Sequence, residues 1–294
     1  MPAIKTENLT KSYGKKRGII DVSLEVDEGA VMGFIGPNGA GKSTTIRTLL
    51  GLLFPTSGSA SVLGMDSVKD NTRILESVGY LPPETAFYSG MRVHEIIELS
   101  ARLRKRDCAE EAKRLCDRLE LDTKRRVGEL SLGNKKKVGI VCAMQHRPRL
   151  YLLDEPTSGL DPLIRQQFFE LLAERNAEGA TVLLSSHVLS DISKHCTHAA
   201  VIREGRLIKQ GRIEELVGAG GKRVVLKGVK DAAELERIGG VHSIEVNGDD
   251  TAFVFAGSAK ELITALAGID FEDAAIGGRE LDEVFMGYYS DGEA

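Results

Sequence analysis

Residues 31–46 read Val-Met-Gly-Phe-Ile-Gly-Pro-Asn-Gly-Ala-Gly-Lys-Ser-Thr-Thr-Ile. An apolar run ends at Ile35, the pattern G-x-x-x-x-G-K-S follows at 36–43, and apolar residues then recur at helical spacing. This is the pattern of a phosphate-binding loop between a strand and a helix. Its glycines permit unusual backbone angles and the close approach of a ligand. The helix that starts near Lys42 adds backbone amides and a positive dipole end.

The loop predicts a binding site for the phosphates of a nucleotide. We expect Lys42 to reach the β- and γ-phosphates and the Ser43 hydroxyl to bind Mg²⁺. The alternative is a Gly-rich turn with an exposed lysine, which the flanking strand and helix patterns disfavour. The residues expected to line the nucleotide are Gly36, Pro37, Asn38, Gly39, Ala40, Gly41, Lys42, Ser43 and Thr44.

The composition is that of an ordinary soluble protein. Of 294 residues, 42% are hydrophobic and 28% charged, and the net charge is −4. This charge gives no overall attraction to nucleic acid or anionic lipid. Because no apolar run approaches about 18 residues, we expect no membrane span and no export signal. The cysteines are expected to be reduced thiols, since they lack metal-ligand spacing; they are Cys108, Cys116, Cys142 and Cys196.

Two further apolar runs end in polar side chains. Residues 150–153 are followed by Asp154 and Glu155, and residues 181–186 by His187. Such runs predict strands of a parallel sheet covered on both faces, whose carboxyl ends bind ligands. Asp154 is expected to hold Mg²⁺ through water, and Glu155 to orient or deprotonate an attacking water. His187 can hydrogen-bond a γ-phosphate. The alternatives are an exposed Asp-Glu turn and a structural histidine.

The remaining patterns predict an α/β domain with a helical insertion. Residues 90–130 show helical periodicity, and with the next helix they give a helical subdomain at about 90–148. Ser131 is expected to N-cap that next helix. The basic clusters at 102–106 and 124–126 are expected to be solvated helix faces. Other predicted elements are strands 3–9, 20–26, 59–64, 74–81, 198–203 and 206–210 and helices 43–51, 162–177 and 188–195.

A second, smaller domain is expected after a Gly-Ala-Gly-Gly linker at 218–221. Its predicted order of elements is βαββαβ, the ferredoxin-like, split-βαβ order of a small α+β domain. We therefore expect domains at 1–218 and 219–294, the second serving assembly or regulation. The predicted elements are strands 223–227, 241–247, 251–255 and 270–276 and helices 231–238, 258–267 and 279–288.

The motifs together predict an Mg²⁺-dependent nucleoside triphosphatase, which works by charge stabilisation and alignment of water. In the order of its motifs the chain resembles the ATP-binding subunit of an ABC transporter, over roughly residues 3–215. The resemblance rests on the loop at 36–44, Leu-Ser-Leu-Gly-Asn at 130–134, the acidic strand at 150–155, the turn at 158–161 and His187. In addition, Leu-Asp-Glu-Val-Phe at 281–285 is similar to the C-terminal domain of bacterial exporter-type subunits.

The resemblance implies a P-loop ABC ATPase domain, with a mixed sheet and the helical insertion, that binds and hydrolyses ATP with Mg²⁺. Tyr13 lies where the family stacks an aromatic ring on adenine, although a packed aromatic is the alternative. In a head-to-tail dimer of ATPase subunits, Ser131 and Gly133 would cap the γ-phosphate held by the other subunit. Asp161 ends the turn at 158–161, which matches the family, and the resemblance therefore assigns it to the nucleotide site.

The resemblance also implies partners and a location. Residues 90–130 would dock on a separate transmembrane permease subunit, which places the chain in the cytoplasm, peripheral on the cytoplasmic face of the cell membrane. ATP hydrolysis would then power transport, with export indicated by the C-terminal similarity. The ATPase partner is a second copy or a different subunit. A soluble ABC-type ATPase acting on ribosomes or DNA is the rival function, but the single ATPase domain disfavours it, and no direct nucleic-acid contact is expected.

Three positions depart from the family pattern. Pro83 stands where the family often has a glutamine that senses Mg²⁺ and the attacking water, and Glu84 is a candidate substitute. Leu132 and Asn134 replace the usual glycine and glutamine of the segment at 130–134. Because Ser131 and Gly133 are retained, ATPase activity is still expected. The departures make the coupling between the ATPase site and the helical insertion uncertain. They also leave a third possible function, a nucleotide-dependent switch with weak catalytic activity.

Overall fold

The computed structural model describes residues 2–14, 16–218, 221–229 and 232–278. The chain divides into two compact units, one ending at Gln210 and the other beginning at Gly211. The domain boundary after residue 218 stays a prediction. The predicted helix at 279–288 and the segment at 281–285 lie outside the described residues.

The first unit is built on a six-stranded sheet with the strand order β11-β10-β4-β9-β8-β7 in the described residues. The five strands from β10 to β7 run parallel. All residues of β4, β8 and β9 are buried, as the apolar runs predict. The strands are β4 (Val31–Ile35), β7 (Val78–Leu81), β8 (Leu150–Asp154), β9 (Thr181–Ser186), β10 (His198–Arg203) and β11 (Arg206–Arg212).

A second sheet packs with the first around a shared core. Its order is β2-β1-β5-β6, with β3 paired to β1, and its pairs are antiparallel. Phe34 of β4, Ile46 of α1 and Val62 of β5 belong to one buried cluster, so burial of apolar surface fixes α1 against both sheets. The elements are β1 (Pro2–Tyr13), β2 (Lys16–Val22), β3 (Glu25–Asp27), α1 (Lys42–Leu49), β5 (Ser57–Val62) and β6 (Met65–Asp66).

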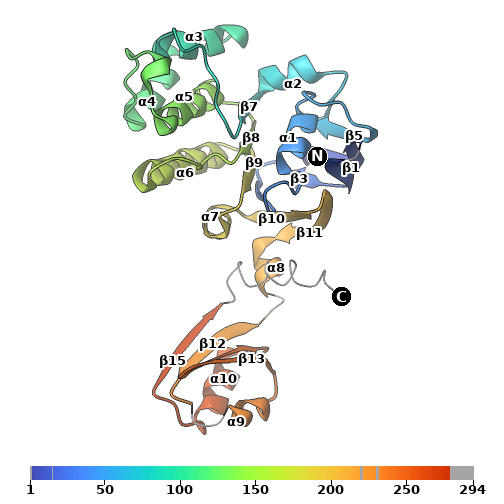
Figure 1. Ribbon diagram of the computed structural model, residues 1–294, viewed down its shortest axis with the longest axis vertical. Helices are drawn as coiled ribbons and strands as arrows, with labels where there is room; N and C mark the ends of the chain where they lie inside the picture. Colours follow the sequence, from blue (N-terminus) through green and yellow to red (C-terminus); the bar gives the residue numbers. More distant parts are fainter. Residues whose placement is uncertain (1, 15, 219–220, 230–231, 279–294) are drawn as a thin grey trace. The chain divides into compact units, whose positions relative to one another are not determined.

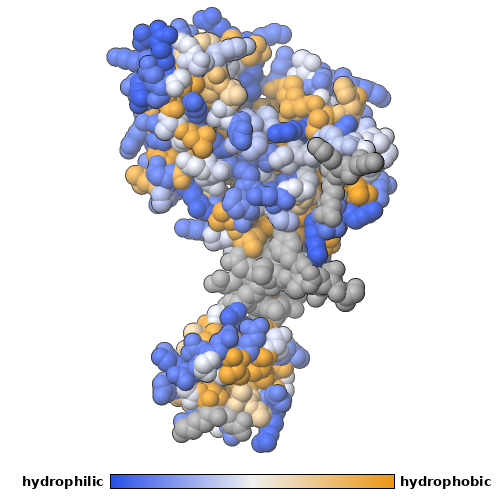
Figure 2. All heavy atoms as spheres, in the orientation of Figure 1, coloured by the Kyte–Doolittle hydropathy of each residue, from blue (hydrophilic) through white to orange (hydrophobic). Residues whose placement is uncertain are grey.

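The predicted helical insertion is present. It contains α3 (Val93–Leu103), α4 (Ala109–Arg118), η1 (Val127–Glu129) and α5 (Leu132–Met144), followed after β8 by α6 (Pro162–Ala177) and after β9 by α7 (Leu189–His195). Figure 1 shows α3, α4 and α5 grouped on one side of β7 and β8, with α1 on the other side. In Figure 2, many hydrophilic side chains cover this insertion, in agreement with the predicted solvated faces.

The strand predicted at 74–81 is wrong in its first half. Only Val78–Leu81 forms a strand, β7, whereas α2 occupies Asn71–Ser77. Ile74 is the one buried residue of α2, so the sequence carries too few apolar positions to show a helical period.

The second unit has its own core and sheet. The strand order β13-β14-β12-β15, with antiparallel pairs throughout, agrees with the ferredoxin-like prediction. Its core includes Val224 of β12, Phe253 of β14 and Leu262 of α10. The elements are α8 (Ile213–Gly218), β12 (Lys222–Lys227), α9 (Ala233–Glu236), β13 (Val241–Asn247), β14 (Asp250–Phe255), α10 (Ala259–Leu266) and β15 (Asp273–Gly278).

No helix in the described part of the chain has both the length and the apolar character needed to cross a membrane.

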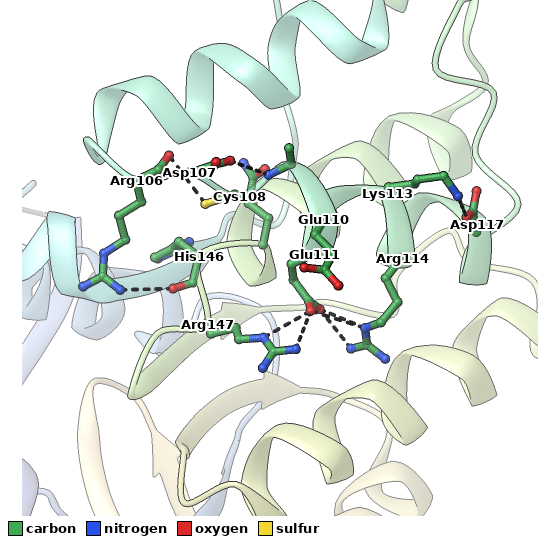
Figure 3. Close-up of a pocket in the computed structure, with 12 residues that line it drawn as sticks. Arg106, Asp107, Cys108, Glu110, Glu111, Lys113, Arg114, Asp117, His146 and Arg147 are labelled. Atoms are coloured by element: carbon green, nitrogen blue, oxygen red, sulfur yellow. Dashed lines mark hydrogen bonds and ion pairs between the residues drawn. The ribbon is translucent and has the colours of Figure 1, made fainter.

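A buried charge cluster joins the helical insertion to α6. Glu111 of α4 accepts hydrogen bonds from Arg114 (Nε, 3.1 Å), from Arg147 (Nη2, 2.7 Å) and from the fully buried Arg175 of α6. Burial raises the pKa of Glu111, but the bonds from Arg114 and Arg147 and the charge of Arg175 outweigh it, so this pKa lies below its usual value. Figure 3 shows Glu111 between Arg114 and Arg147, at a pocket of about 1050 Å³ that no predicted site residue lines.

We expect Glu111→Ala to destabilise the first unit strongly, because it removes the carboxylate that Arg114, Arg147 and the buried Arg175 share, and leaves Arg114 with Glu174 and Arg175 with Glu178 alone. Breaking a buried ion pair costs about 3–5 kcal/mol, and the free energy of unfolding, measured by urea denaturation, should fall by about this amount. The control is Glu110→Ala, an exposed neighbour in the first turn of α4, which should cost less than about 1 kcal/mol. Equal losses in the two variants would contradict the prediction.

Candidate active site

The predicted phosphate loop lies between β4 and α1. Gly39 and Gly41 have φ angles of 83° and 113°, in the region that favours glycine. At Gly36 a Cβ atom would lie 2.4 Å from the carbonyl oxygen of Ile202, so no larger residue fits. The loop therefore needs its glycines to adopt this backbone path. The first amides of α1 have no partner within the helix, so they can bind an anion.

The ammonium of Lys42 is held inside this loop. Lys42 is only 6% exposed. Its Nζ donates to the carbonyl oxygens of Gly36 at 2.6 Å and Pro37 at 3.3 Å, and lies 3.4 Å from Oε1 of Glu155. A buried cation thus stands where the loop meets the acidic end of β8. Ser43 and Thr44, in the first turn of α1, are partly buried.

Asp154 ends β8 as a fully buried carboxylate. Ser185 of β9 donates its hydroxyl to Asp154 Oδ1 at 2.7 Å and accepts from the Glu155 amide at 2.9 Å. Among the described residues Asp154 Oδ2 has no hydrogen-bond partner. An unpartnered buried carboxylate oxygen is costly, and it is the type of ligand that Mg²⁺ prefers. Asp154 therefore fits the predicted metal site.

Glu155 lies between the loop lysine and His187. Its Oε2 is 2.8 Å from Nδ1 of His187, which follows β9 and is 56% exposed, while its Oε1 faces Lys42 and makes no hydrogen bond within the described chain. The φ angle of Glu155 is 48°, in the left-handed region that is uncommon for residues other than glycine. Glu155 therefore has one oxygen beside the His187 ring and one buried oxygen that faces only the Lys42 ammonium among the described residues.

The remaining predicted residues lie outside this group. Tyr13 ends β1 and is 43% exposed, with the Lys11 Nζ 5.5 Å from the centre of its ring. Ser131 N-caps α5 as predicted, accepting from the Asn134 amide at 3.3 Å. Asp161 N-caps α6, accepting from the Ile164 amide at 3.0 Å.

The chain does not bring Ser131 and Gly133 to its own phosphate loop. In Figure 1 the helix α5 that they begin and α1 lie on opposite sides of β7 and β8. A Cβ atom at Gly133 would instead lie 3.0 Å from the carbonyl oxygen of Gly159, in the turn after β8. Across the described residues, no hydrogen bond or ion pair links Ser131 to the loop.

The chain is similar to known proteins in sequence and in fold. The profile of the family described as ABC transporter matches residues 19–158. The chain is 38% identical over 214 residues to the bacitracin transport ATP-binding protein BcrA of Bacillus licheniformis, which covers 70% of this chain and 69% of that one. This chain belongs to the ABC transporter family. It is also 35% identical over 236 residues to the uncharacterized ABC transporter ATP-binding protein YxlF of Bacillus subtilis (strain 168), covering 79% and 78% of the two chains.

A solved ATP-binding subunit of an ABC transporter has the same fold. It superposes with a TM-score of 0.69 at 30% identity, over 74% of this chain and 92% of that chain. The resemblance inferred from the sequence is thus confirmed, and so is the P-loop ABC ATPase fold. The first unit is an ATP-binding ATPase domain of this family.

The structure adds one residue to this ABC ATPase site and does not support another. Ser185 was not predicted, since a serine inside an apolar strand carries no local signal. Its position opposite Asp154 appears only in the pairing of β8 with β9. Glu84, the candidate substitute for the side chain missing at Pro83, is exposed, and within the described residues it has no hydrogen bond or ion pair to the site.

We expect Glu155→Gln to nearly abolish ATP turnover while leaving nucleotide binding intact. The variant loses a positioned base, which contributes about 10²–10⁴-fold to a rate. Phosphate release and nucleotide titration measure the two effects. Glu84→Gln, an exposed site, is the matched control. Wild-type turnover in Glu155→Gln would remove Glu155 from the role of base.

Lys42→Ala should weaken ATP binding instead. Hydrogen bonds to charged groups contribute about 1.5–3 kcal/mol, equivalent to about 10–100-fold in Kd. Calorimetric titration with ATP checks this, with the exposed Lys105→Ala as the control. If the two variants bind ATP equally well, Lys42 does not contact the nucleotide.

Proposed function

We propose that this chain is the ATPase subunit that powers transport, as export, through a separate transmembrane permease. One observation carries the proposal: Lys42, Asp154, Glu155 and His187 converge at the carboxyl ends of β4, β8 and β9. Family membership supports ATP-driven transport, and the name of the BcrA relative refers to transport of bacitracin. Export is supported by the sequence similarity of residues 281–285 to exporter-type subunits.

The residues of the site suggest how hydrolysis proceeds. The loop amides bind the triphosphate, and the Lys42 ammonium exchanges the carbonyls of the loop for phosphate oxygens. Ser43 and Asp154 would hold Mg²⁺, which when bound offsets the negative charge of the phosphates. Glu155 then orients or deprotonates water with its Oε1. His187, whose Nδ1 donates to the other oxygen of Glu155, donates from Nε2 to the γ-phosphate in its doubly protonated form.

We infer that the active form is a head-to-tail pair of ATPase subunits. The exposed cap at Ser131 and the adjacent Gly133 lie away from the loop of their own chain, so they are available to cap the γ-phosphate bound by a second subunit. Tyr13 exposes its ring for stacking on adenine, and Asp161 holds the turn beside Gly133. Since the chain carries a single set of motifs, a homodimer is the simplest assembly.

The helical insertion is the proposed docking region for the permease. The subunit would then lie in the cytoplasm, peripheral on the cytoplasmic face of the membrane, and contact no nucleic acid. Closing of the pair on ATP and opening after hydrolysis would move the permease through this insertion.

The proposal is tested by purifying the tagged chain from gently solubilised native cells and identifying its partners by mass spectrometry. The expected result is a polytopic membrane protein in stoichiometric amount, absent from a parallel purification of untagged cells. Recovery of ribosomes or DNA-bound factors instead, with the chain absent from the membrane fraction, would contradict the transport proposal and favour a soluble ABC-type ATPase.

A further inference from the structure

Lys136 is a buried cation that joins the helical insertion to the main chain after β7. It lies in α5, five residues beyond the cap at Ser131, and is 2% exposed. Its Nζ donates to the carbonyl oxygens of Pro82 at 3.2 Å and Pro83 at 2.8 Å. The segment that lacks a polar side chain at position 83 is thus bound through its backbone by a side chain from α5.

The surroundings of Lys136 indicate that a lysine at this position does not serve the stability of the fold alone. In the part of the chain that the structure describes, no carboxylate lies within ion-pair distance of its Nζ. Burial lowers the pKa of Lys136 to about 8, although the charges of Asp154 and Glu155 act in the opposite direction. An apolar side chain of similar length would avoid the cost of desolvating the ammonium. A lysine here is better explained by what it connects.

Lys136 connects two parts of the proposed catalytic cycle. On one side, Pro82 and Pro83 follow Leu81, which pairs with Leu153, the residue before Asp154. On the other side, α5 begins at Ser131, the proposed cap for a second subunit's γ-phosphate. The ammonium therefore lies on a short path between that cap and the carboxylates of β8.

The helix α5 and the strand β7 are packed closely against each other. A Cβ atom at Gly139 of α5 would lie 2.6 Å from Thr85 Cγ2 and 2.7 Å from Leu81 Cδ1, and one at Gly79 of β7 would lie 2.4 Å from the carbonyl oxygen of Ala143. Two glycines thus let the helix and the strand pack directly on each other. This packing fixes α5 against β7 itself, and the hydrogen bonds of Lys136 extend the contact to residues 82–83, beyond the end of the strand.

We propose that Lys136 is a positioning residue for ATP hydrolysis, which ties α5 and its Ser131 cap to the main chain beside Asp154 and Glu155. These hydrogen bonds couple the helical insertion to the ATPase site, a role that the side chain of Pro83 cannot fill because it has no donor or acceptor. The inference rests on the proposed ATPase function, because it concerns how that site is aligned. Lys136 does not touch the nucleotide in this scheme; it acts through the backbone of residues 82–83.

The test compares Lys136→Met with wild type in the purified full-length chain. Methionine keeps the length and removes the donors. We expect kcat for phosphate release to fall about 10–100-fold, the range for a small misplacement of reacting groups, while KM for ATP changes less than about twofold. Thermal stability should stay equal or rise, since a buried charge is removed. Lys136→Gln, which keeps an N–H donor toward the two carbonyls, should recover part of kcat.

The control is Lys137→Met, a partly exposed neighbour on the same helix, which should leave kcat unchanged. If the wild type is active and Lys136→Met has the same kcat, the inference about Lys136 is overturned but the proposed function is not. The same holds if the kcat of Lys136→Gln is no higher than that of Lys136→Met. If Lys136→Met does not fold, Lys136 is structural, unless Lys136→Gln folds with wild-type stability and reduced kcat. No phosphate release from the wild-type chain would overturn the proposed function together with the inference.

Discussion

The pairing of three parallel strands is the constraint on which the site depends. Ile35 at the end of β4 lies opposite Ser186, and Asp154 at the end of β8 lies opposite Ser185. This register places the phosphate loop, the two carboxylates and His187 at one edge of the sheet. A slip of one residue would turn each side chain to the opposite face. Because both faces of these strands are buried, close packing of the side chains on each face holds this register, and the same register assembles the chemistry.

The charges at this edge are only partly balanced by the protein. Lys42 contacts neutral carbonyls and stands 3.4 Å from Glu155, while Asp154 keeps one oxygen unpartnered among the described residues. Buried charges and unsatisfied oxygens reduce stability. A site that binds an anion and a metal needs these groups to be available. The hydrogen bonds of Ser185 hold Asp154 and the backbone of Glu155 in place meanwhile.

Local signals were sufficient for much of this structure. The glycine and lysine pattern predicted the loop, and the cap at Ser131 could be predicted because capping depends on a few adjacent residues. Asp161 was assigned to the nucleotide site, and the structure shows it as the N-cap of α6. Ser185 and Lys136 were missed because their roles arise from strand register and helix packing, which leave no local pattern. The helix α2 was missed for a different reason, since Ile74 is its one buried residue. Glu84 was a plausible neighbour in sequence that the fold leaves exposed.

The most direct test of the whole account is a crystal structure of the Glu155→Gln protein with ATP and Mg²⁺. We predict triphosphate on the loop at 36–44, Lys42 moved from the Gly36 carbonyl to a phosphate oxygen, and a metal ion held by Ser43 and Asp154. We also predict that Ser131 of a second copy lies against the γ-phosphate. Nucleotide bound away from this loop, or bound there with Lys42 still on the Gly36 carbonyl and no metal beside Asp154, would contradict it.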